Sequence, residues 1–320
     1  MKQEPLVSVI LPVYNAEEYV SQAIQSIVDQ TLANFELIVI DDASTDKSLD
    51  IIKSFNDPRI KVLMHQENKG YPHATIYGLS HAKGKYIARM DADDFSAPSR
   101  LMKQIHLLEN HEGFIFVGSR RFWITPKGKY FFPEPIRNKE WLVETREDLM
   151  SGKRYFTDPS VTARKEDIER VGGYRHYQRS GMDVDLWLRL FETGKNAGTL
   201  TEPLYGRRLI PGAITFSPQT TALNKIPRML AQERFEKGSD AVMRKEEIRF
   251  TITPQMIKES HIWRISALWN SAIRCVDADD FSGSLQFAKV AILIGYSNRV
   301  SFRWATKYCA KLLLKIFRWV

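Results

Sequence analysis

Short apolar runs that end in polar residues mark the first ninety positions of the chain. Val7–Val13 (VSVILPV) and Phe35–Ile40 (FELIVI) are almost uninterrupted and rich in β-branched residues, which is typical of strands buried in a parallel sheet. Ile60–Met64 and Tyr86–Met90 are shorter runs of the same kind. The pattern therefore predicts four buried strands.

Between these strands, apolar residues recur at the spacing of an α-helix. Helices are predicted over Glu17–Gln30, over a segment that carries Leu49 to Phe55, and over Ala74–His81. Strands that alternate with helices through short connections predict an α/β fold with a doubly wound, mostly parallel sheet.

Three of the predicted strands are followed by polar clusters: Tyr14-Asn15, Asp41-Asp42 and Asp91 to Asp94. Parallel strands end at the same edge of a sheet, and the ligands of such sheets bind at the carboxyl ends of the strands. The three clusters are therefore expected to meet at one edge, although they are far apart in the sequence.

The last third of the chain has a different pattern. From about residue 224 onward it is rich in long helical segments, predicted at Ile262–Val276, Leu285–Ile294 and Ser301–Val320. Proline and serine interrupt regular structure near residues 216–225. We therefore expect an α/β domain over residues 1–220 and a helical C-terminal region over residues 221–320.

The net charge of +8 is concentrated at the C-terminal end. From Phe281 onward the sequence contains seven lysines and arginines and no acidic residue, whereas the rest is close to neutral. A nucleic-acid-binding domain would be expected to carry basic residues along a whole face. Nucleic acid is therefore not an expected partner.

The composition favours a cytoplasmic setting. Cys275 and Cys309 match no metal-ligand or redox spacing, so reduced thiols are expected. The N-terminal apolar run contains Pro12 and no cleavage site of a signal peptide. No apolar stretch reaches the roughly 18–20 residues of a membrane span.

The hexapeptide DADDFS occurs twice, at Asp91–Ser96 and at Asp277–Ser282. The first copy follows a predicted strand, where carboxylates either form a solvated loop or hold a divalent cation against phosphates. Asp91 and Asp93 would need a turn to converge, because alternate residues of an extended segment point in opposite directions. The second copy lies between two helical patterns, where Asp279, Asp280 or Ser282 is expected to cap the following helix.

Two common nucleotide-binding motifs are absent. The chain has neither GxxxxGK[ST] nor GxGxxG after a strand, so a bound nucleotide would have to be held by acidic residues and a metal.

Five blocks together resemble the inverting glycosyltransferases of family 2, which have the GT-A fold and use nucleotide-sugar donors. The blocks are VSVILPVYNAEEYVSQAIQSIVDQT, FELIVIDDASTD, NKG, GKYIARMDADD and GGYRHYQRSGMDVDLWLRL. Their order and spacing match over about residues 5–215. The resemblance implies a GT-A catalytic domain, a Rossmann-like sheet flanked by helices.

The resemblance also implies a donor site, with a UDP-sugar as the default. The loop lining the nucleotide pocket would contain Pro12, Tyr14, Asn15 and Glu17. Asp42 would accept a hydrogen bond from a uracil-type base.

Three further aspartates would act on the sugar and the diphosphate. Asp91 and Asp93 match the DxD pair of the family, which forms the metal site. Within this pair, Asp91 would lie near the ribose and sugar, and Asp93 would ligate Mn²⁺ or Mg²⁺ on the diphosphate. Asp183 matches the general base, which would take a proton from the acceptor hydroxyl as that oxygen attacks the anomeric carbon. Direct displacement of this kind inverts the configuration.

The sequence departs from the family pattern at Met182, where glutamate is usual, at Ile210, where histidine is usual, and at Asp158, where relatives often carry histidine. These departures leave open a catalytically silent nucleotide-sugar-binding or scaffold subunit. A nucleotidyltransferase is a further alternative, although it would be expected to need a basic, glycine-rich loop that LPVYNAEEY does not offer.

The QxxRW signature of processive polymerases is missing, which favours addition of a single sugar. As often in this family, the acceptor would be a glycan or a lipid-linked sugar in bacterial surface polysaccharide synthesis.

The C-terminal segment is predicted to be a basic amphipathic helix. Arg299, Arg303, Lys307, Lys311 and Lys315 recur every fourth residue, opposite an apolar face. A helix of this kind suits an anionic membrane interface, and equally suits packing on protein. We therefore expect residues 299–320 either to attach the protein peripherally to the inner face of the cell membrane or to pack on protein.

Overall fold

The computed structural model describes residues 4–132, 139–151, 158–177, 181–210, 223–278 and 280–297. Its contacts divide the chain into two compact units. The α/β unit comprises residues 1–121, 135–207 and 227–240, and the helical unit comprises residues 122–134, 208–226 and 241–320.

Ten strands of the described chain form one sheet. They are β1 (Val7–Val13), β2 (Phe35–Asp41), β3 (Ile60–Met64), β4 (Tyr86–Arg89), β5 (Phe95–Ser96), β6 (Phe114–Ile124), β7 (Tyr130–Phe131), β8 (Trp141–Glu144), β9 (Thr162–Arg164) and β10 (Asn196–Arg208). The main path runs β3-β2-β1-β4-β9-β6-β10-β5, while β7 pairs with β6 and β8 pairs with β10.

The sheet is mixed. The four strands predicted from apolar runs are parallel, through the pairs β1–β2, β2–β3 and β1–β4. The pairs β4–β9, β6–β9 and β5–β10, which involve strands added later in the chain, are antiparallel. The predicted α/β class is confirmed. The predicted parallel strands lie at the N-terminal side of the chain, and the antiparallel strands that follow them make the sheet mixed.

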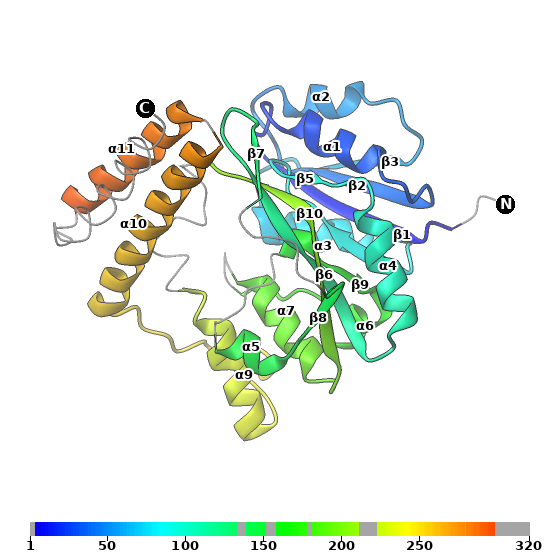
Figure 1. Ribbon diagram of the computed structural model, residues 1–320. Coiled ribbons are helices and arrows are strands. Elements are labelled where there is room, and N and C mark those ends of the chain that lie inside the picture. The colour runs from blue at the N-terminus through cyan, green and yellow to red at the C-terminus, as the bar shows by residue number, and fades with distance from the viewer. Residues whose placement is uncertain are drawn as a thin grey trace. The chain divides into compact units, whose positions relative to one another are not determined.

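The helices of the α/β unit are α1 (Val20–Val28), α2 (Ser48–Ser54), α3 (Tyr71–Ser80), α4 (Arg100–Asn110), α5 (Arg146–Met150), the short 3-10 helix η1 (Asp158–Ser160), α6 (Lys165–Arg170), α7 (Met182–Phe191) and α9 (Ile226–Lys237). In Figure 1, α1 and α2 lie on one side of the sheet and α7 lies on the other.

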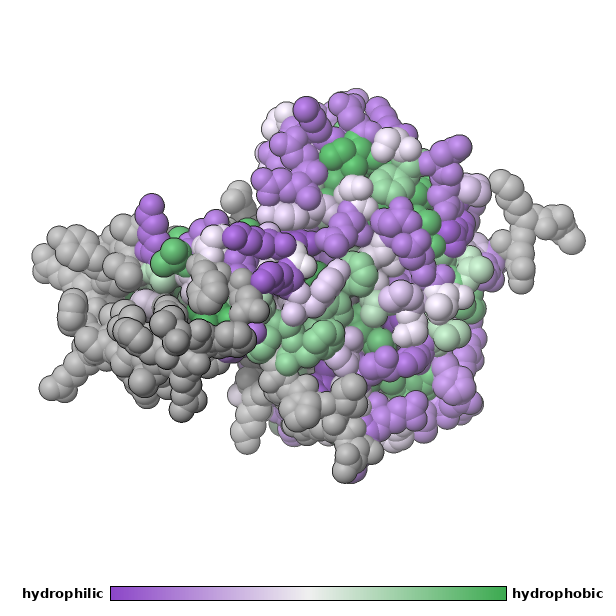
Figure 2. All heavy atoms as spheres, turned by 45° about the horizontal axis from the view of Figure 1, so that its top comes forward, coloured by the Kyte–Doolittle hydropathy of each residue, from purple (hydrophilic) through white to green (hydrophobic). Residues whose placement is uncertain are grey.

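Alternation along β1 explains the two cores of this unit. Val7, Val9 and Leu11 pack with buried residues of α1 and α4, whereas Ile10 packs with buried residues of α3 and α7. Successive strand residues point to opposite faces, so a strand buried on both faces reads as a continuous apolar run. The surface of this unit seen in Figure 2 is mainly hydrophilic, with smaller hydrophobic areas.

The helical unit contains α10 (Pro254–Asp277) and α11 (Phe281–Ser297). Trp269 and Phe287 are buried in its core with Trp123. Asp280 Oδ1 accepts a hydrogen bond from Gly283 N–H at 2.9 Å, and Asp280 Oδ2 accepts one from Lys127 N–H at 3.2 Å. The second DADDFS copy therefore caps a helix, as predicted for Asp280.

Among the helices in the described part of the chain, none combines the length and the hydrophobicity that crossing a bilayer would require. The predicted basic helix at residues 299–320 and most of the predicted boundary at residues 216–225 lie outside the described residues.

Candidate active site

The order of the strands reverses at β1. The chain passes from β1 to β2 on one side and later adds β4 on the other side. In open α/β sheets, ligands bind at such a switch point, outside the carboxyl ends of the strands. Val13 is paired with Asp41, and Ile10 with Arg89. The three predicted polar clusters thus follow three neighbouring parallel strands, of which β1 and β2 end together and β4 ends beside Ile10.

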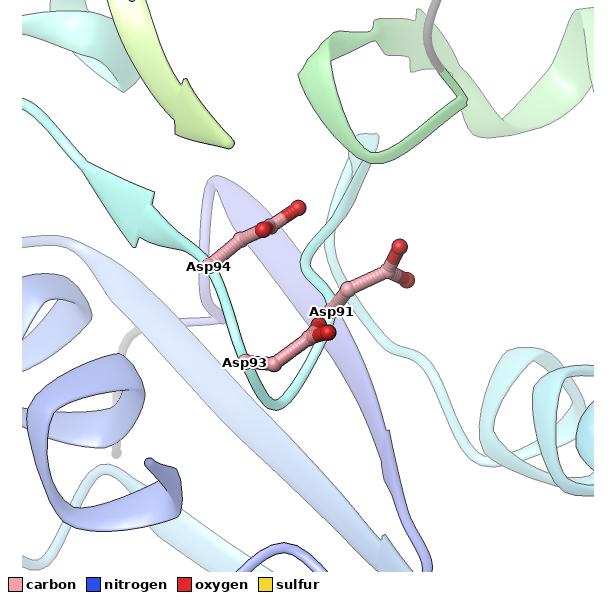
Figure 3. Close-up of side chains that lie close together, drawn as sticks. All are labelled: Asp91, Asp93 and Asp94. Atoms are coloured by element: carbon pink, nitrogen blue, oxygen red, sulfur yellow. The ribbon is translucent and has the colours of Figure 1, made fainter. Parts of the chain in front are cut away.

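The first DADDFS copy forms a tight turn between β4 and β5. Asp94 N–H donates to Asp91 O at 3.3 Å, which closes the turn that the sequence required. One carboxylate oxygen each from Asp91, Asp93 and Asp94 lies within 4.8 Å of the others. Figure 3 shows the three side chains on this single turn. We call residues 91–94 the acidic turn.

The acidic turn fits a divalent cation. Carboxylate oxygens are the ligands that Mg²⁺ and Mn²⁺ prefer, and such ions use one or two carboxylates together with phosphates and water. Three converging carboxylates exceed that requirement. Asp94 was not among the predicted ligands, although its position in DADD is a signal that the sequence contains.

A buried arginine orients the start of the turn. Arg89 is 1% exposed, and its guanidinium donates to Thr75 Oγ1 at 2.9 Å and to Tyr71 Oη at 2.5 Å. Its Nη2 also lies 3.6 Å from Asp91 Oδ1. The positive charge of Arg89 attracts these carboxylates and so offsets part of their mutual repulsion. This attraction is stronger than it would be in water, because the site is partly buried.

Tyr205 of β10 contacts both ends of the acidic turn. Its hydroxyl donates to Asp94 Oδ2 at 2.6 Å and accepts from Asp91 N–H at 3.4 Å. Burial, followed by the negative charges of Asp94 and Asp91, raises the pKa of Tyr205 well above its usual value. The hydroxyl therefore keeps its proton and acts as the donor to Asp94.

A second buried arginine lies behind Tyr205. Arg100 Cζ is 5.4 Å from the centre of the Tyr205 ring, and Arg100 Nη1 donates to the carbonyl oxygens of Arg89 at 3.1 Å and Pro159 at 2.6 Å. Burial lowers the pKa of Arg100 to about 10, so that the guanidinium stays charged at neutral pH. Sequence reasoning found neither Tyr205 nor the two arginines.

The loop after β1 is bonded to the loop after β2. Asn15 adopts a left-handed conformation with φ of 47°, and its Oδ1 accepts from Thr45 N–H at 2.8 Å. Glu17 Oε2 accepts from Lys47 N–H at 3.0 Å. The predicted pocket residues Asn15 and Glu17 thus hold the neighbouring loop.

The other two predicted residues of that loop differ in exposure. Pro12 is buried within β1. Tyr14 directly follows β1 and is 48% exposed. Its ring is therefore accessible to a ligand at this edge of the sheet.

Asp42 is buried and makes several contacts. Its Oδ1 lies 2.6 Å from His65 Nδ1 and accepts from Lys69 N–H at 3.0 Å, while its Oδ2 accepts from Gly70 N–H at 2.7 Å. The preceding Asp41 accepts from Ser44 N–H at 3.2 Å through Oδ2. Asp41 Oδ1 is buried without a hydrogen-bond partner among the described residues, which makes Asp41 a further polar group at this edge.

Asp183 lies in the first turn of α7, after Gly181, which has a φ of 79°. Asp183 is half-buried, whereas Met182 is 2% exposed and belongs to the apolar core. Asp158 begins η1, and Ile210 is the last described residue after β10. The carboxylate of Asp183 thus belongs to an element separate from the acidic turn.

Comparison with known proteins decides the family. The family described as Glycosyl transferase family 2 matches residues 8–205 of the 320-residue chain, a span that contains the acidic turn and α7. The chain belongs to glycosyltransferase family 2. The resemblance inferred from the sequence is confirmed, and with it the assignment as a glycosyltransferase enzyme.

Two relatives and one solved structure illustrate the similarity. "Putative glycosyltransferase EpsE" of Bacillus subtilis (strain 168) is 38% identical over 212 residues, which cover 64% of this chain and 73% of that protein. The Escherichia coli "UDP-Glc:alpha-D-GlcNAc-diphosphoundecaprenol beta-1,3-glucosyltransferase WfgD" is 41% identical over 112 residues, which cover 35% of this chain and 44% of that enzyme.

The structure of "Mannosyltransferase PcManGT from Pyrobaculum calidifontis in complex with GDP-Man and Mn2+" superposes with a TM-score of 0.55 at 19% identity, covering 99% of this chain and 87% of that one. A likeness at this identity shows the shared GT-A fold alone.

Proposed function

We propose that the protein is an inverting, metal-dependent, non-processive glycosyltransferase. It moves a sugar from a nucleotide-diphosphate donor to a hydroxyl acceptor in the synthesis of a bacterial surface polysaccharide or lipid-linked glycan. The observation that carries the proposal is the convergence of Asp91, Asp93 and Asp94 on one turn at the switch point of the sheet.

The donor is a nucleotide sugar, with its nucleotide beside the loop that contains Pro12, Tyr14, Asn15 and Glu17. The base-reading role belongs to Asp42. A carboxylate has about four lone-pair positions, and three contacts to Asp42 come from the protein, so that one acceptor position remains for a base. The name of WfgD contains UDP-Glc, whereas PcManGT was solved with GDP-Man; UDP is the default.

Asp91 and Asp93 hold a divalent cation, Mn²⁺ or Mg²⁺, at the diphosphate. The carboxylate geometry of the acidic turn and the Mn²⁺ in the PcManGT complex support this assignment. A bound cation supplies Lewis-acid stabilisation of the charge that develops on the nucleoside diphosphate as it leaves.

Asp183 is the general base. Its carboxylate accepts the proton of the acceptor hydroxyl while that oxygen forms a bond to the anomeric carbon. The bond from that carbon to the diphosphate oxygen breaks with its electron pair, so the configuration at the anomeric carbon inverts. Since the displacement is direct, the chain needs no covalent nucleophile.

The acceptor is a lipid-linked sugar, reached from the cytoplasmic face of the membrane. The name of WfgD specifies a diphosphoundecaprenol acceptor, and the seven basic residues after Phe281 suit an anionic lipid surface.

Asp183→Asn tests the base. Removing a general base typically costs about 10²–10⁴-fold in rate, so kcat should fall by that factor while donor binding is retained. Released nucleoside diphosphate is measured over a panel of donors with Mn²⁺, with and without lipid-linked acceptors. Asp50→Asn is the matched control, because Asp50 also lies in the first turn of a helix, α2. An Asp183→Asn enzyme with wild-type kcat would reject the base assignment.

Asp93→Asn and removal of metal by EDTA test the cation. Transfer should be lost in both cases and should return to the EDTA-treated wild type when Mn²⁺ is restored. Asp277→Asn, at the position of Asp91 in the second hexapeptide copy, should behave as wild type. Full activity in EDTA would contradict metal dependence, and donor binding without turnover would favour a silent nucleotide-sugar-binding subunit.

A further inference from the structure

We propose that Tyr205 is a positioning residue of the acidic turn. Its hydroxyl holds Asp94 in place, so that Asp91 and Asp93, and not Asp94, present their carboxylates to the cation. This inference rests on the proposed metal-dependent function, and it assigns different roles to three carboxylates that lie within 4.8 Å of one another.

The Tyr205 hydroxyl joins the first and last residues of the turn. It accepts from Asp91 N–H at 3.4 Å and donates to Asp94 Oδ2 at 2.6 Å, while Asp94 N–H donates to Asp91 O at 3.3 Å. The ring of Tyr205 has no exposed surface. A rigid, enclosed ring thus fixes the hydroxyl, and through it the turn.

Burial separates Asp94 from the two other carboxylates. Asp94 is 3% exposed, whereas the side chain of Asp91 is 34% exposed and Asp93 is half-buried. A cation that also binds phosphates and water needs ligands on the open side of the turn. Asp91 and Asp93 meet this condition, whereas Asp94 is buried.

The charge of Asp94 is opposed by a buried cation of the protein. Arg100 is fully buried against the Tyr205 ring, and its charge interacts with that of Asp94. A buried carboxylate with a buried counter-charge and a short hydrogen bond is costly to disturb, because the loss of one partner leaves the other charge uncompensated. Asp91 also lies beside a buried arginine, because Arg89 Nη2 is 3.6 Å from its Oδ1, so that exposure, and not charge alone, distinguishes Asp91 and Asp93 from Asp94.

Backbone pairing brings Tyr205 to this position. Tyr205 and Gly206 pair with Ser96 and Phe95 of β5 in antiparallel register, and Ala97 N–H donates to Leu204 O at 2.9 Å. The segment that follows the turn is therefore tied to β10. A side chain 111 residues away in the sequence closes the metal turn.

Tyr205→Phe removes the hydroxyl and keeps the ring. Residues that orient metal ligands typically change metal affinity by about 10–100-fold, so the Mn²⁺ dissociation constant should rise by at least that lower factor. It is measured by electron paramagnetic resonance of free Mn²⁺ with full-length protein and saturating UDP. Tyr86→Phe is the matched control, because Tyr86 is also fully buried and its hydroxyl bonds Glu109, away from the turn.

Two Asp94 variants separate a positioning role from a ligand role. Asp94→Asn keeps an oxygen that accepts from Tyr205 and should bind Mn²⁺ almost as tightly as wild type. Asp94→Ala should weaken Mn²⁺ binding as Tyr205→Phe does, and the double variant should be no weaker than either, because both remove the same hydrogen bond.

The inference is overturned if Tyr205→Phe binds Mn²⁺ as tightly as Tyr86→Phe does. It is also overturned if Asp94→Asn loses as much affinity as Asp93→Asn, since Asp94 would then be a direct ligand. If the wild-type protein binds no Mn²⁺ in the presence of UDP, the proposed metal-dependent function itself fails. If the wild type binds Mn²⁺ and Tyr205→Phe binds it equally well, only the positioning role of Tyr205 fails.

Discussion

Asp42 joins segments of the chain that are distant in sequence. Its carboxylate receives the backbone N–H groups of Lys69 and Gly70 and lies beside His65, and the side chain is 3% exposed. Asp42→Ala leaves these buried donors without their acceptor. We predict a loss of about 2–4 kcal/mol in the free energy of unfolding, measured by urea denaturation.

The control for Asp42 is Asp50→Ala, because Asp50 is an exposed aspartate in α2. Exposed substitutions usually change stability by about 0.5 kcal/mol or less, so its midpoint should stay close to that of wild type. An Asp42→Ala protein with the wild-type midpoint would mean that other contacts hold residues 65–70.

Single residues differ in how far the sequence reveals them. The acidic turn could be found because DADD follows a buried strand and stands among the other blocks of the family, whereas the same four letters at Asp277–Asp280 cap a helix. Tyr205 and Arg100 could not, because a buried hydroxyl and a buried guanidinium leave no motif when their partners are 111 and 59 residues away. Only the pairing of β5 with β10 brings Tyr205 to the turn.

At the level of elements, a buried charge cluster holds α7. Asp185 of α7 accepts from Arg175 and Arg189, and Asp240, after α9, accepts from Arg175 and Arg234. Asp185 and Asp240 have no exposed surface. Asp240→Ala leaves Arg175 with Asp185 and Arg234 with Glu192 but removes one negative charge from a cluster of three arginines, so one buried positive charge is uncompensated. We predict a destabilisation of about 3–5 kcal/mol, measured by chemical denaturation.

Lys225→Ala is the control for the charge cluster. Its ion pair with Glu259 spans 3.5 Å between side chains that are about half exposed, and exposed pairs contribute little. Its denaturation midpoint should match wild type. Equal effects of Asp240→Ala and Lys225→Ala would show that burial does not set the strength of the cluster.

Asp280 links α11 to the turn before β7 in a pH-dependent way. Burial raises the pKa of Asp280, but hydrogen bonds from Gly283, Thr125 and Lys127 outweigh burial and lower it below its usual range. A lowered folded pKa contributes stability above the unfolded pKa, and that stability is lost as pH falls through the folded pKa.

We therefore predict that Asp280→Asn destabilises the protein at pH 7 and that its difference from wild type shrinks below about pH 4. Urea unfolding at several pH values measures this difference. A difference that stays constant with pH would mean that the charge of Asp280 contributes nothing.

The elements predicted well are those with a local cause. Strands β1 and β3 have the predicted bounds. Both faces of β1 are buried, so its apolar run is continuous, whereas β3 lies at the edge of the sheet and is only partly buried. Strands β6 and β10 carry charged residues, including Arg120 and Glu202, and depend on long-range pairing, so the sequence did not reveal them. Helix α10 begins earlier than expected, at Pro254, because Thr253 caps it.

The charge of the whole molecule is gathered at one end. Arg299, Arg303, Lys307, Lys311 and Lys315 follow one another at every fourth position of a segment predicted to be helical. Near an anionic bilayer each basic residue contributes about 1 kcal/mol, so that this segment would supply much of the affinity for such a surface.

Truncation after Ser297 tests this role. We predict that the truncated protein no longer sediments with vesicles containing an anionic lipid, whereas the full chain does so at low salt and is released at high salt, because salt screens exposed charges. Vesicles of neutral phosphatidylcholine are the control and should bind both forms weakly. A double charge reversal, Lys311→Glu with Lys315→Glu, should act as the truncation does, since attraction becomes repulsion at two positions of the same face. If the truncated protein still binds anionic vesicles, the basic segment packs on protein and the membrane is contacted elsewhere.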